Sequence, residues 1–389
     1  MGVTTTVSWG ILFYAFSVFL RPMEADLGWS RAALSGAFTV ALLVSGLVAP
    51  LVGRWIDRRG ARVLMTFGSC LGTVLLLAWS GVRDLPLFYL VWAAMGIAMA
   101  CTLYDPAFAV IARWFSGAHA PGRAGAMMIV TLLAGLASTI FLPVAAWLAE
   151  LQGWRTALLS LAAILALSTI APHALLLRHA PHAAVDPHAT TRADVAASFR
   201  ALLRHPPFVW LAVSFWLYGL ASVGLGIHLV SYLSERGYPP TLAAVATGAV
   251  GAAQLLGRIA FTPLERRAPR RWLIAATLGA QPIAMLALLA LPLVPGAAAL
   301  GVYAFILLFG ISRGAATLAR ATLIAGRYGP SRFGAVNGAL SLIVTFSHAL
   351  APVALGAAHD LTASYDHALW VLLALSVIAT GLVLLADPD

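Results

Sequence analysis

The sequence predicts an all-α membrane protein with twelve transmembrane helices in two pseudo-symmetric six-helix bundles. Three observations lead to this prediction: the composition, the length of the apolar runs and an internal repeat. The chain has 389 residues, of which 61% are hydrophobic and only 10% are charged. A soluble domain carries about 45–50% apolar and about 25% charged residues. Lipid must therefore cover much of the surface, which excludes an ordinary soluble enzyme and a disordered chain.

The apolar runs are long enough to cross a bilayer, which takes about 20 helical residues. Because backbone groups must be bonded internally in hydrocarbon, each run is expected to be a helix. The first run has no basic segment before it and leads into further runs, so we expect no cleavable signal peptide. The spans are placed at residues 3–22, 30–53, 61–81, 86–113, 123–148, 154–177, 207–233, 240–264, 271–292, 297–326, 332–357 and 366–386.

The positive charge gives the expected orientation. All 24 basic residues are arginines, and the formal net charge is +10. In a soluble protein this charge would suggest a nucleic-acid partner, but in a membrane protein basic residues gather in cytoplasmic loops. With the N-terminus inside, sixteen arginines fall in cytoplasmic loops, five in outer loops and three within spans. We therefore expect a multi-pass protein of the cytoplasmic (inner) membrane with both termini in the cytoplasm, and no nucleic-acid partner.

One long polar loop, residues 178–206, separates spans six and seven. Its second half, residues 194–204, has helical periodicity and is predicted to lie on the inner membrane surface. The spacing of its histidines fits no metal-ligand motif, so a solvated linker is expected. Cys70 and Cys101 lie inside apolar runs and are interpreted as packing residues. We expect no metal site and no cofactor.

Short motifs repeat on the two sides of this loop. Around span five, Arg123 and Pro143 match Arg332 and Pro352 around span eleven, at an offset of 209 residues. The repeat divides the chain into a six-helix bundle at 1–177, a linker at 178–206 and a second six-helix bundle at 207–389. Two such bundles with a substrate site between them are typical of secondary transporters.

The loop after span two carries the segment Gly53-Arg54-Trp55-Ile56-Asp57-Arg58-Arg59-Gly60-Ala61-Arg62. This segment resembles the loop between helices two and three of the major facilitator superfamily, and the resemblance covers the whole chain. It implies a conformational latch, in which Asp57 caps a helix of the opposite half and bonds an arginine at the end of helix four, here Arg113. A carboxylate at a helix N-terminus is stabilised by the helix dipole. The alternative is that these arginines serve only as the positive charge that is usual in cytoplasmic loops. The latch residues are Gly53, Asp57, Arg58, Arg59, Arg62 and Arg113.

Three further segments resemble the monocarboxylate and oxalate–formate branch of this superfamily: Arg113-Trp114-Phe115, Gly153-Trp154-Arg155 and Gly257-Arg258. The resemblance implies a cavity lined by helices one, four, seven and ten, and substrate contact by Arg258. A monomer is the default expectation, since the sequence leaves the oligomeric state open. The branch's oxalate carriers use a lysine in helix eleven, where this chain offers His348. The segment from Gly135 to Pro143 departs from the superfamily's antiporter motif, which weakens a drug-antiporter reading.

Charged residues inside spans are the candidate functional groups, because each needs a partner or a wet cavity. Arg313 lies near the middle of span ten, where Gly310 and Gly314 leave room for a ligand or a neighbouring helix. Its guanidinium can hold a carboxylate through two parallel hydrogen bonds; the alternative is a bond to a backbone carbonyl.

Arg320 lies two turns further along the same face. Asp105 is the acidic residue well inside a span, and we hypothesise an Asp105–Arg320 gate or a proton-carrying role for Asp105, against a static bond.

The remaining candidates also have structural alternatives. Arg258 could contact substrate or extend to the membrane surface. His348 and His228 could bind substrate, His348 in a pH-sensitive way, or form interhelical hydrogen bonds. Tyr14 and Tyr104 could line a pocket, as could Tyr218 and Trp216, although aromatic residues in spans more often pack or anchor at the interface.

These residues predict a secondary active transporter that moves a small, monocarboxylate-like organic anion by alternating access. The partner ion is a proton or a counter-anion. Three arginines against one aspartate inside the spans make a positive cavity, which favours anions. The chain has no phosphate-binding loop, so it is not expected to hydrolyse ATP or to be an enzyme. The alternatives are proton-driven efflux of drugs or other xenobiotics, and a receptor or scaffold without flux.

Overall fold

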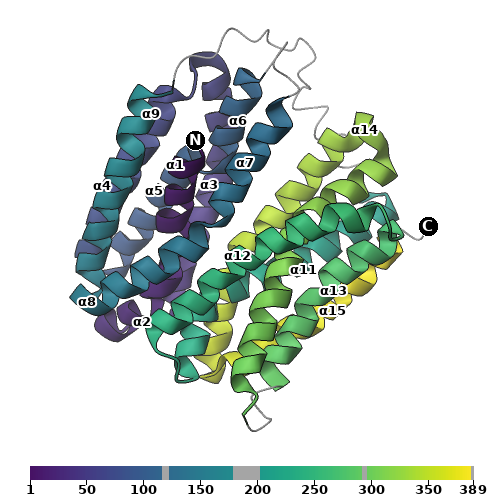
Figure 1. The fold of residues 1–389 in the computed structure, drawn as a ribbon. Coiled ribbons are helices and arrows are strands. Elements are labelled where there is room, and N and C mark those ends of the chain that lie inside the picture. The colour runs from purple at the N-terminus through teal and green to yellow at the C-terminus, as the bar shows by residue number, and fades with distance from the viewer. Residues whose placement is uncertain (116–121, 178–201, 291–295, 387–389) are drawn as a thin grey trace. The chain divides into compact units, whose positions relative to one another are not determined.

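The computed structural model describes residues 1–115, 122–177, 202–290 and 296–386. Within these ranges every regular element is a helix, and eleven segments are long and apolar enough to cross a membrane (Figure 1). One of them, Gly125–Leu175, has 51 residues, or about 77 Å of helix, against a hydrocarbon core of about 30 Å. It contains a reversal at Gly153, whose φ of 77° and ψ of 159° are not helical. Two spans therefore lie in this segment, and the predicted twelve-helix fold is confirmed.

The helices of the first six spans have the following bounds: α1 Gly2–Ser8, η1 Trp9–Tyr14, α2 Phe16–Leu27, α3 Arg31–Arg59, α4 Arg62–Gly81, α5 Leu85–Thr102, α6 Tyr104–Trp114, α7 Arg123–Gly135, α8 Ala137–Leu165, η3 Ala166–Ile170 and α9 Ala171–Leu175. The remaining helices are α11 Pro206–Glu235, α12 Pro240–Glu265, α13 Arg270–Ala290, α14 Ala298–Thr362 and α15 Tyr365–Ala386. The elements α1, η1 and α2 form one span, and α14 contains two, Ala298–Tyr328 and Val336–Thr362.

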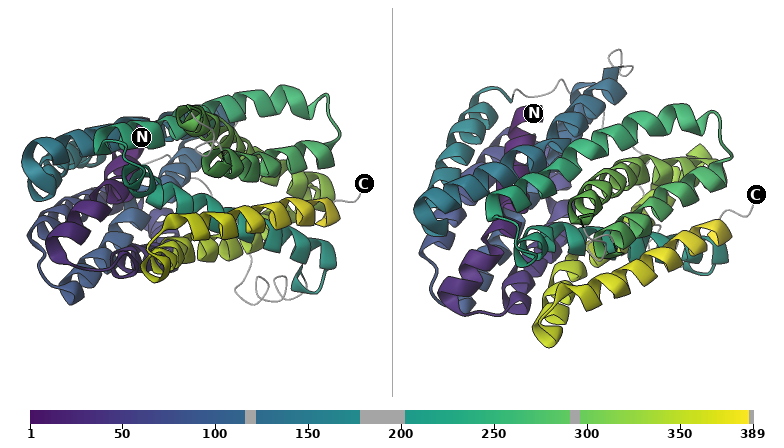
Figure 2. Two further views of the ribbon diagram at one scale, coloured as in Figure 1. Left: turned by 90° about the horizontal axis from the view of Figure 1, so that it is seen from below. Right: turned by 60° about the horizontal axis from the view of Figure 1, so that its bottom comes forward.

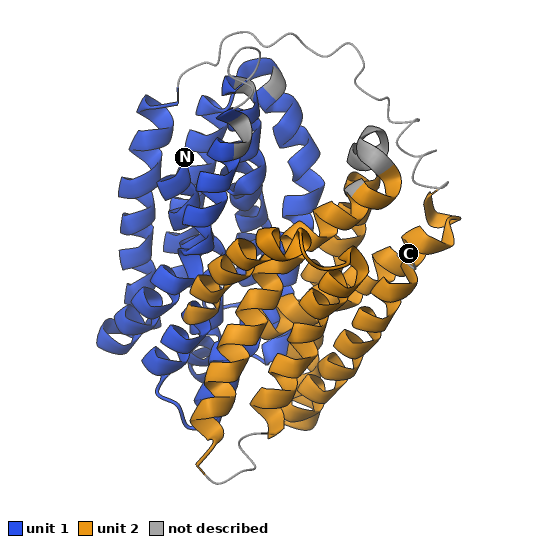
Figure 3. Ribbon diagram, turned by 45° about the vertical axis from the view of Figure 1, so that its right-hand side comes forward, with its two compact units in different colours: residues 1–185, 227–248 blue, residues 186–226, 249–389 orange. Residues whose placement is uncertain are grey.

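The chain forms two compact units, which Figure 3 shows in different colours. Unit 1 contains residues Met1–Val185 and Ile227–Gly248, and unit 2 contains Asp186–Gly226 and Ala249–Asp389. The end of α11 and the start of α12 thus pack with the first part of the chain. The division into bundles at 177 and 207 stays a prediction from the repeat.

Unit 1 is built around a buried aromatic core. The rings of Phe16 and Phe38 stack at 4.6 Å, and Trp79 and Trp92 meet edge to face at 4.8 Å. Such pairs contribute about 0.5–1.5 kcal/mol each beyond simple burial. The α4 helix carries Trp79 and lies alongside α5 and α8 (Figures 1 and 2). This core supports the first span, whose middle turn is the π-helix η1.

The span that carries Asp105 is broken near its middle. The α5 helix ends at Thr102, and Leu103 adopts φ −82° and ψ −149° before α6 begins. Pro106 fits the first turn of the new helix, where its missing N–H is not needed. The break places Tyr104 and Asp105 at the start of a second helix within one span.

In unit 2, α13 lies between α14 and α15, as Figure 2 shows. Polar side chains join these helices to α11. The Ser312 hydroxyl donates to the Thr277 carbonyl at 2.7 Å, so the Tyr218 hydroxyl, 3.0 Å away, donates to Ser312. These bonds use up the polar group of Tyr218, which is 7% exposed. Tyr218 is therefore a packing residue in this conformation.

A close contact between α12 and α14 explains the glycines around Arg313. A Cβ at Gly314 would overlap the carbonyl of Gln254, a Cβ at Gly310 would overlap Ala253, and a Cβ at Gly257 would overlap the carbonyl of Ile311. Small residues spaced by four allow helix backbones to approach closely in lipid. Of the two roles open to Gly310 and Gly314, the structure assigns the packing of a neighbouring helix.

We expect Gly314→Ala to destabilise unit 2 by about 1–3 kcal/mol, because the added methyl group must push two helix backbones apart. The measurement is thermal unfolding of the purified protein in lipid nanodiscs. Gly381→Ala in α15 is the matched control, since nothing lies within 4 Å of its Cβ position. An unchanged melting temperature for Gly314→Ala would show that α12 and α14 do not pack this closely.

Candidate functional site

Arg313 is oriented by the contact between α12 and α14. Gly314 faces α12, and one residue corresponds to about 100° around a helix, so Arg313 points to another neighbour, which is α11. Its Nη1 atom lies 3.0 Å from the Cβ position of Gly226, where a larger residue would displace it. The guanidinium carbon is 5.6 Å from the centre of the Phe309 ring.

The side chain of Arg313 is partly exposed, and it donates no hydrogen bond and forms no ion pair with any described residue. Among the described residues, therefore, no backbone carbonyl accepts a hydrogen bond from Arg313, which was its alternative role. A guanidinium near the middle of a span with unused donors is suited to an anionic ligand.

His348 packs against the same face of α11 that Arg313 packs against. Its Nε2 atom is 2.9 Å from the Cβ position of Gly219, seven residues before Gly226. Positions seven apart lie two turns apart on one helix face. Gly219 therefore makes room for the imidazole of His348, and Gly226 makes room for the guanidinium of Arg313. The charges of Arg313 and Arg320 both act on His348. The structure thus brings two of the predicted substrate residues together.

Arg320 donates hydrogen bonds within unit 2. Its Nη2 atom donates to Asn337 Oδ1 at 2.8 Å and to Ser341 Oγ, and its Nε atom donates to Asn337 Oδ1 at 3.2 Å. Both acceptors are neutral and belong to the second span of α14. The sequence analysis missed Asn337 and Ser341, although their spacing of four residues places them on one helix face. The pairing of Arg320 with Asp105 stays a prediction.

Asp105 is exposed at the first turn of α6, and its carboxylate has no partner among the described residues. Tyr104 beside it stacks with Phe108 at 5.3 Å and contacts Trp9 of η1 at 5.0 Å. Tyr14 also contacts Trp9, at 6.1 Å between ring centres. The structure therefore gathers Tyr14 and Tyr104 around one indole in unit 1.

His228 and Arg258 are placed differently from Arg313. His228 is fully buried in unit 1, and its Nε2 atom is 3.4 Å from the Ser35 hydroxyl of α3. This is the interhelical bond considered as its alternative role. Arg258 is partly exposed on α12 and follows Gly257 in the contact with α14. Substrate contact by either residue stays a prediction.

The latch motif lies at the end of α3 and the start of α4. Arg58 and Arg59 are exposed in the last turn of α3, and the Arg59 guanidinium lies over the Trp55 ring at 4.8 Å. Gly60, with φ of 80°, ends the helix, and Arg62 begins the next one. The side chains of Asp57 and Arg113 lie outside the described residues, as does the polar linker. The latch stays a prediction.

The sequence analysis missed a buried charge cluster in unit 1. Arg31, only 4% exposed, pairs with Glu24 of α2 at 2.9 Å and with Glu235 at the end of α11. Nearby, Glu150 Oε1 accepts the backbone N–H of Thr241 at 2.9 Å. These bonds attach the segment 227–248 to α2, α3 and α8. Arg31 had been counted as a loop charge, and nothing in the local sequence reveals its partners.

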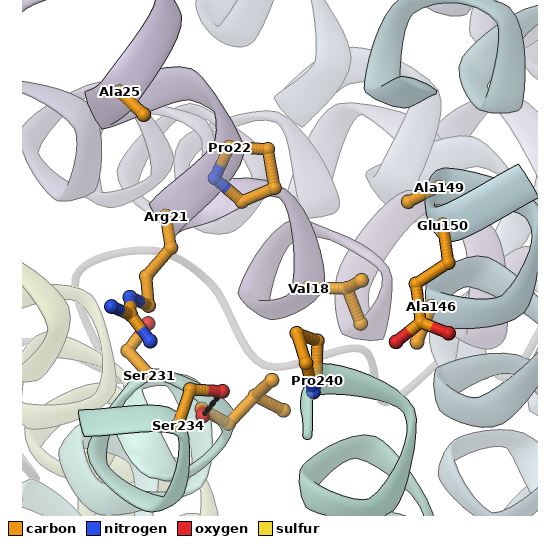
Figure 4. A pocket seen from close by; sticks show the side chains of 11 residues that line it. Val18, Arg21, Pro22, Ala25, Ala146, Ala149, Glu150, Ser231, Ser234 and Pro240 are labelled. Atoms are coloured by element: carbon orange, nitrogen blue, oxygen red, sulfur yellow. Dashed lines mark hydrogen bonds between the residues drawn. The ribbon is translucent and has the colours of Figure 1, made fainter. Parts of the chain in front are cut away.

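Unit 1 also contains a cavity of about 410 Å³ (Figure 4). Its polar lining comes from Arg21 of α2, Glu150 of α8, and Ser231 and Ser234 of α11. None of these was a predicted site residue. No group of three or more metal-ligating side chains occurs among the described residues.

A family model described as Major Facilitator Superfamily matches residues 2–352. The chain belongs to this superfamily and is a membrane transporter. It is 26% identical to monocarboxylate transporter 13 of Bos taurus over 97% of this chain and 84% of that protein. It is also 27% identical to the oxalate:formate antiporter of Oxalobacter formigenes, over 36% of this chain and 32% of that protein.

Solved structures agree on the fold. A mutant of the nucleoside transporter NupG aligns over 99% of each chain with a TM-score of 0.80 and 13% sequence identity. A bacterial homolog of the lysosomal transporter Spinster, in an inward-facing and unoccupied conformation, gives a TM-score of 0.76 at 17% identity, over 100% of this chain and 96% of that chain. The similarity in sequence to monocarboxylate and oxalate carriers agrees with the branch that Gly257-Arg258 and the neighbouring motifs resemble.

Proposed function

We propose that this superfamily member moves a small, monocarboxylate-like organic anion across the cytoplasmic membrane by alternating access, coupled to a proton or to a counter-anion. The observation that carries the proposal is the Arg313 guanidinium, partly exposed near the middle of its span and without an acceptor among the described residues. A carboxylate can accept two parallel hydrogen bonds from such a group. The monocarboxylate transporters and the oxalate:formate antiporter among its relatives support this ligand class.

His348 supplies the second half of the proposed anion site. Its imidazole lies on the same α11 face as Arg313 and can donate or accept a hydrogen bond according to its protonation. We further propose that the protein lies in the inner membrane with both termini in the cytoplasm, on the basis of the arginine bias between alternate loops. A monomer is the default proposal for its oligomeric state.

Counterflow in proteoliposomes tests this proposal. Vesicles loaded with a short carboxylate should accumulate the same radiolabelled acid, while a cationic dye should not be moved. Dye extrusion without acid counterflow would favour xenobiotic efflux instead. A folded protein that moves neither would leave a receptor or scaffold without flux.

Asp105 is the proposed proton carrier or gate, since it is an exposed carboxylate without a partner among the described residues. We expect Asp105→Asn to lose uptake driven by an inward proton gradient, by about tenfold or more, while acid counterflow persists. The measurement is radiolabelled acid uptake with and without a pH gradient. Asp84→Asn is the control, because Asp84 caps α5 through Leu87 N–H and asparagine caps equally well. Unchanged gradient-driven uptake would remove Asp105 from the coupling mechanism.

A further inference from the structure

The cavity in unit 1 is lined by two opposite charges that do not pair with each other. Arg21 is exposed and has no hydrogen bond or ion pair with any described residue. Glu150 uses Oε1 to accept the Thr241 N–H, which leaves Oε2 without a donor among the described residues. Figure 4 shows the guanidinium and the carboxylate on opposite sides of the cavity. One side thus offers donors and positive charge, and the other offers an acceptor and negative charge.

The Ser231 hydroxyl adds a buried group that has no partner in the protein. Ser231 is 1% exposed, lines the cavity, and its Oγ atom bonds no described residue. Many helical serine and threonine hydroxyls among the described residues bond a carbonyl of the preceding turn, as Ser234 does to Val230 at 2.8 Å. A buried hydroxyl left unbonded costs about 1–3 kcal/mol. Its position beside Arg21 in Figure 4 suits a ligand oxygen.

Proline removes one helical hydrogen bond in the part of α2 that lines this cavity. Pro22 lies inside α2 and has no N–H, so the carbonyl of Val18 one turn earlier lacks its helical donor. Both residues line the cavity. The remaining walls are apolar and come from residues such as Ala146 and Val230. The cavity volume of about 410 Å³ lies in the range of about 300–1,000 Å³ that is usual for small-molecule sites.

We propose that this cavity binds a small zwitterion, a molecule with a carboxylate and an ammonium group joined by a short aliphatic chain. Arg21 and the Ser231 hydroxyl hold the carboxylate, and Glu150 Oε2 holds the ammonium group. A simple anion would be repelled by Glu150 and a simple cation by Arg21, so a ligand that carries both charges matches the walls best. This site is separate from Arg313 and His348, which lie in unit 2.

The test is calorimetric titration of the Arg313→Gln protein in lipid nanodiscs with γ-aminobutyrate, butyrate and butylammonium, which share a four-carbon chain. This background removes the proposed carboxylate site of unit 2, to which butyrate would otherwise bind. We expect γ-aminobutyrate to bind, and the two singly charged analogues to bind about tenfold more weakly or worse. Arg21→Gln, Glu150→Gln and Ser231→Ala should each weaken γ-aminobutyrate binding by about tenfold, the effect of one lost hydrogen bond to a charged group. Glutamine at position 150 can still accept the Thr241 N–H, so the local fold is kept.

A charge exchange tests whether the two opposite charges hold the ligand. Thermal unfolding is its check on folding, because arginine at position 150 cannot accept the Thr241 N–H. Arg21→Glu and Glu150→Arg should each abolish binding, whereas the double variant should recover it, because the ligand can bind in the reverse direction. Arg313→Gln should leave γ-aminobutyrate binding unchanged, which separates this site from the proposed transport site. Butyrate binding to Arg313→Gln as tight as that of γ-aminobutyrate, no heat with any probe, or loss of γ-aminobutyrate binding in Arg313→Gln would each overturn the proposal.

Discussion

Arg313→Gln is expected to raise the KM for carboxylate counterflow by about 10- to 150-fold. A hydrogen bond to a charged group contributes about 1.5–3 kcal/mol, and the pair of parallel bonds from a guanidinium is lost when glutamine replaces it. Glutamine keeps most of the length of the side chain and can still lie against Gly226. The loss should therefore appear in substrate binding and leave the melting temperature unchanged.

The measurement is counterflow of a radiolabelled short carboxylate over a range of concentrations. Arg313→Lys keeps the charge as a single point and should fall between the wild-type protein and the glutamine variant. Arg83→Gln, an exposed arginine of a loop, is the control and should leave the KM unaltered. Normal counterflow by Arg313→Gln would show that the anion is held elsewhere.

The spans could be read from the sequence because hydrocarbon leaves the backbone few choices. The reversal at Gly153 and the broken span at Leu103 depend on single residues and shift only the boundaries. The first span, predicted at 3–22, extends over Gly2–Leu27 because Pro22 is accommodated inside α2. Fold prediction from the sequence therefore succeeded where the environment, rather than a particular neighbour, determines the structure.

The candidate site was predicted only in part, because the role of a polar side chain in a span depends on which helix it meets. Arg313 and Arg320 have the same local signal, two arginines on one face of span ten. The first lies beside Gly226 and donates to no described residue, whereas the second donates to Asn337 and Ser341. Likewise, His348 lies beside Arg313, while His228 is buried against Ser35. These differences arise from tertiary contacts that the repeat and the motifs do not encode.

Arg31→Gln is expected to release the segment 227–248 from α2 and α3. Arg31 is buried, whereas Glu24 and Glu235 are 33% and 27% exposed. The removal of Arg31 is expected to cost about 1–3 kcal/mol, between the values for exposed and for fully buried ion pairs, because water can reach the two carboxylates that it leaves behind. The repeat places this segment in the second half of the sequence, although it packs in unit 1. A transporter whose sequence halves move against each other must break this attachment in each cycle, so weakening it should change the conformational equilibrium.

Thiol labelling of His228→Cys, in a background without Cys70 and Cys101, measures this release. His228 is fully buried next to Ser35, so labelling reports opening between α11 and α3. An effect of about 2 kcal/mol corresponds to a labelling rate about 30-fold higher in Arg31→Gln. Arg155→Gln is the matched control, since its ion pair with Asp26 is partly exposed, at 34% and 48%, and such pairs contribute about 0–1 kcal/mol. The double variant Arg31→Glu with Glu235→Arg re-forms one ion pair and should restore slow labelling. Equal labelling rates in Arg31→Gln and the parent protein would show that the cluster does not hold the segment 227–248 against α2 and α3.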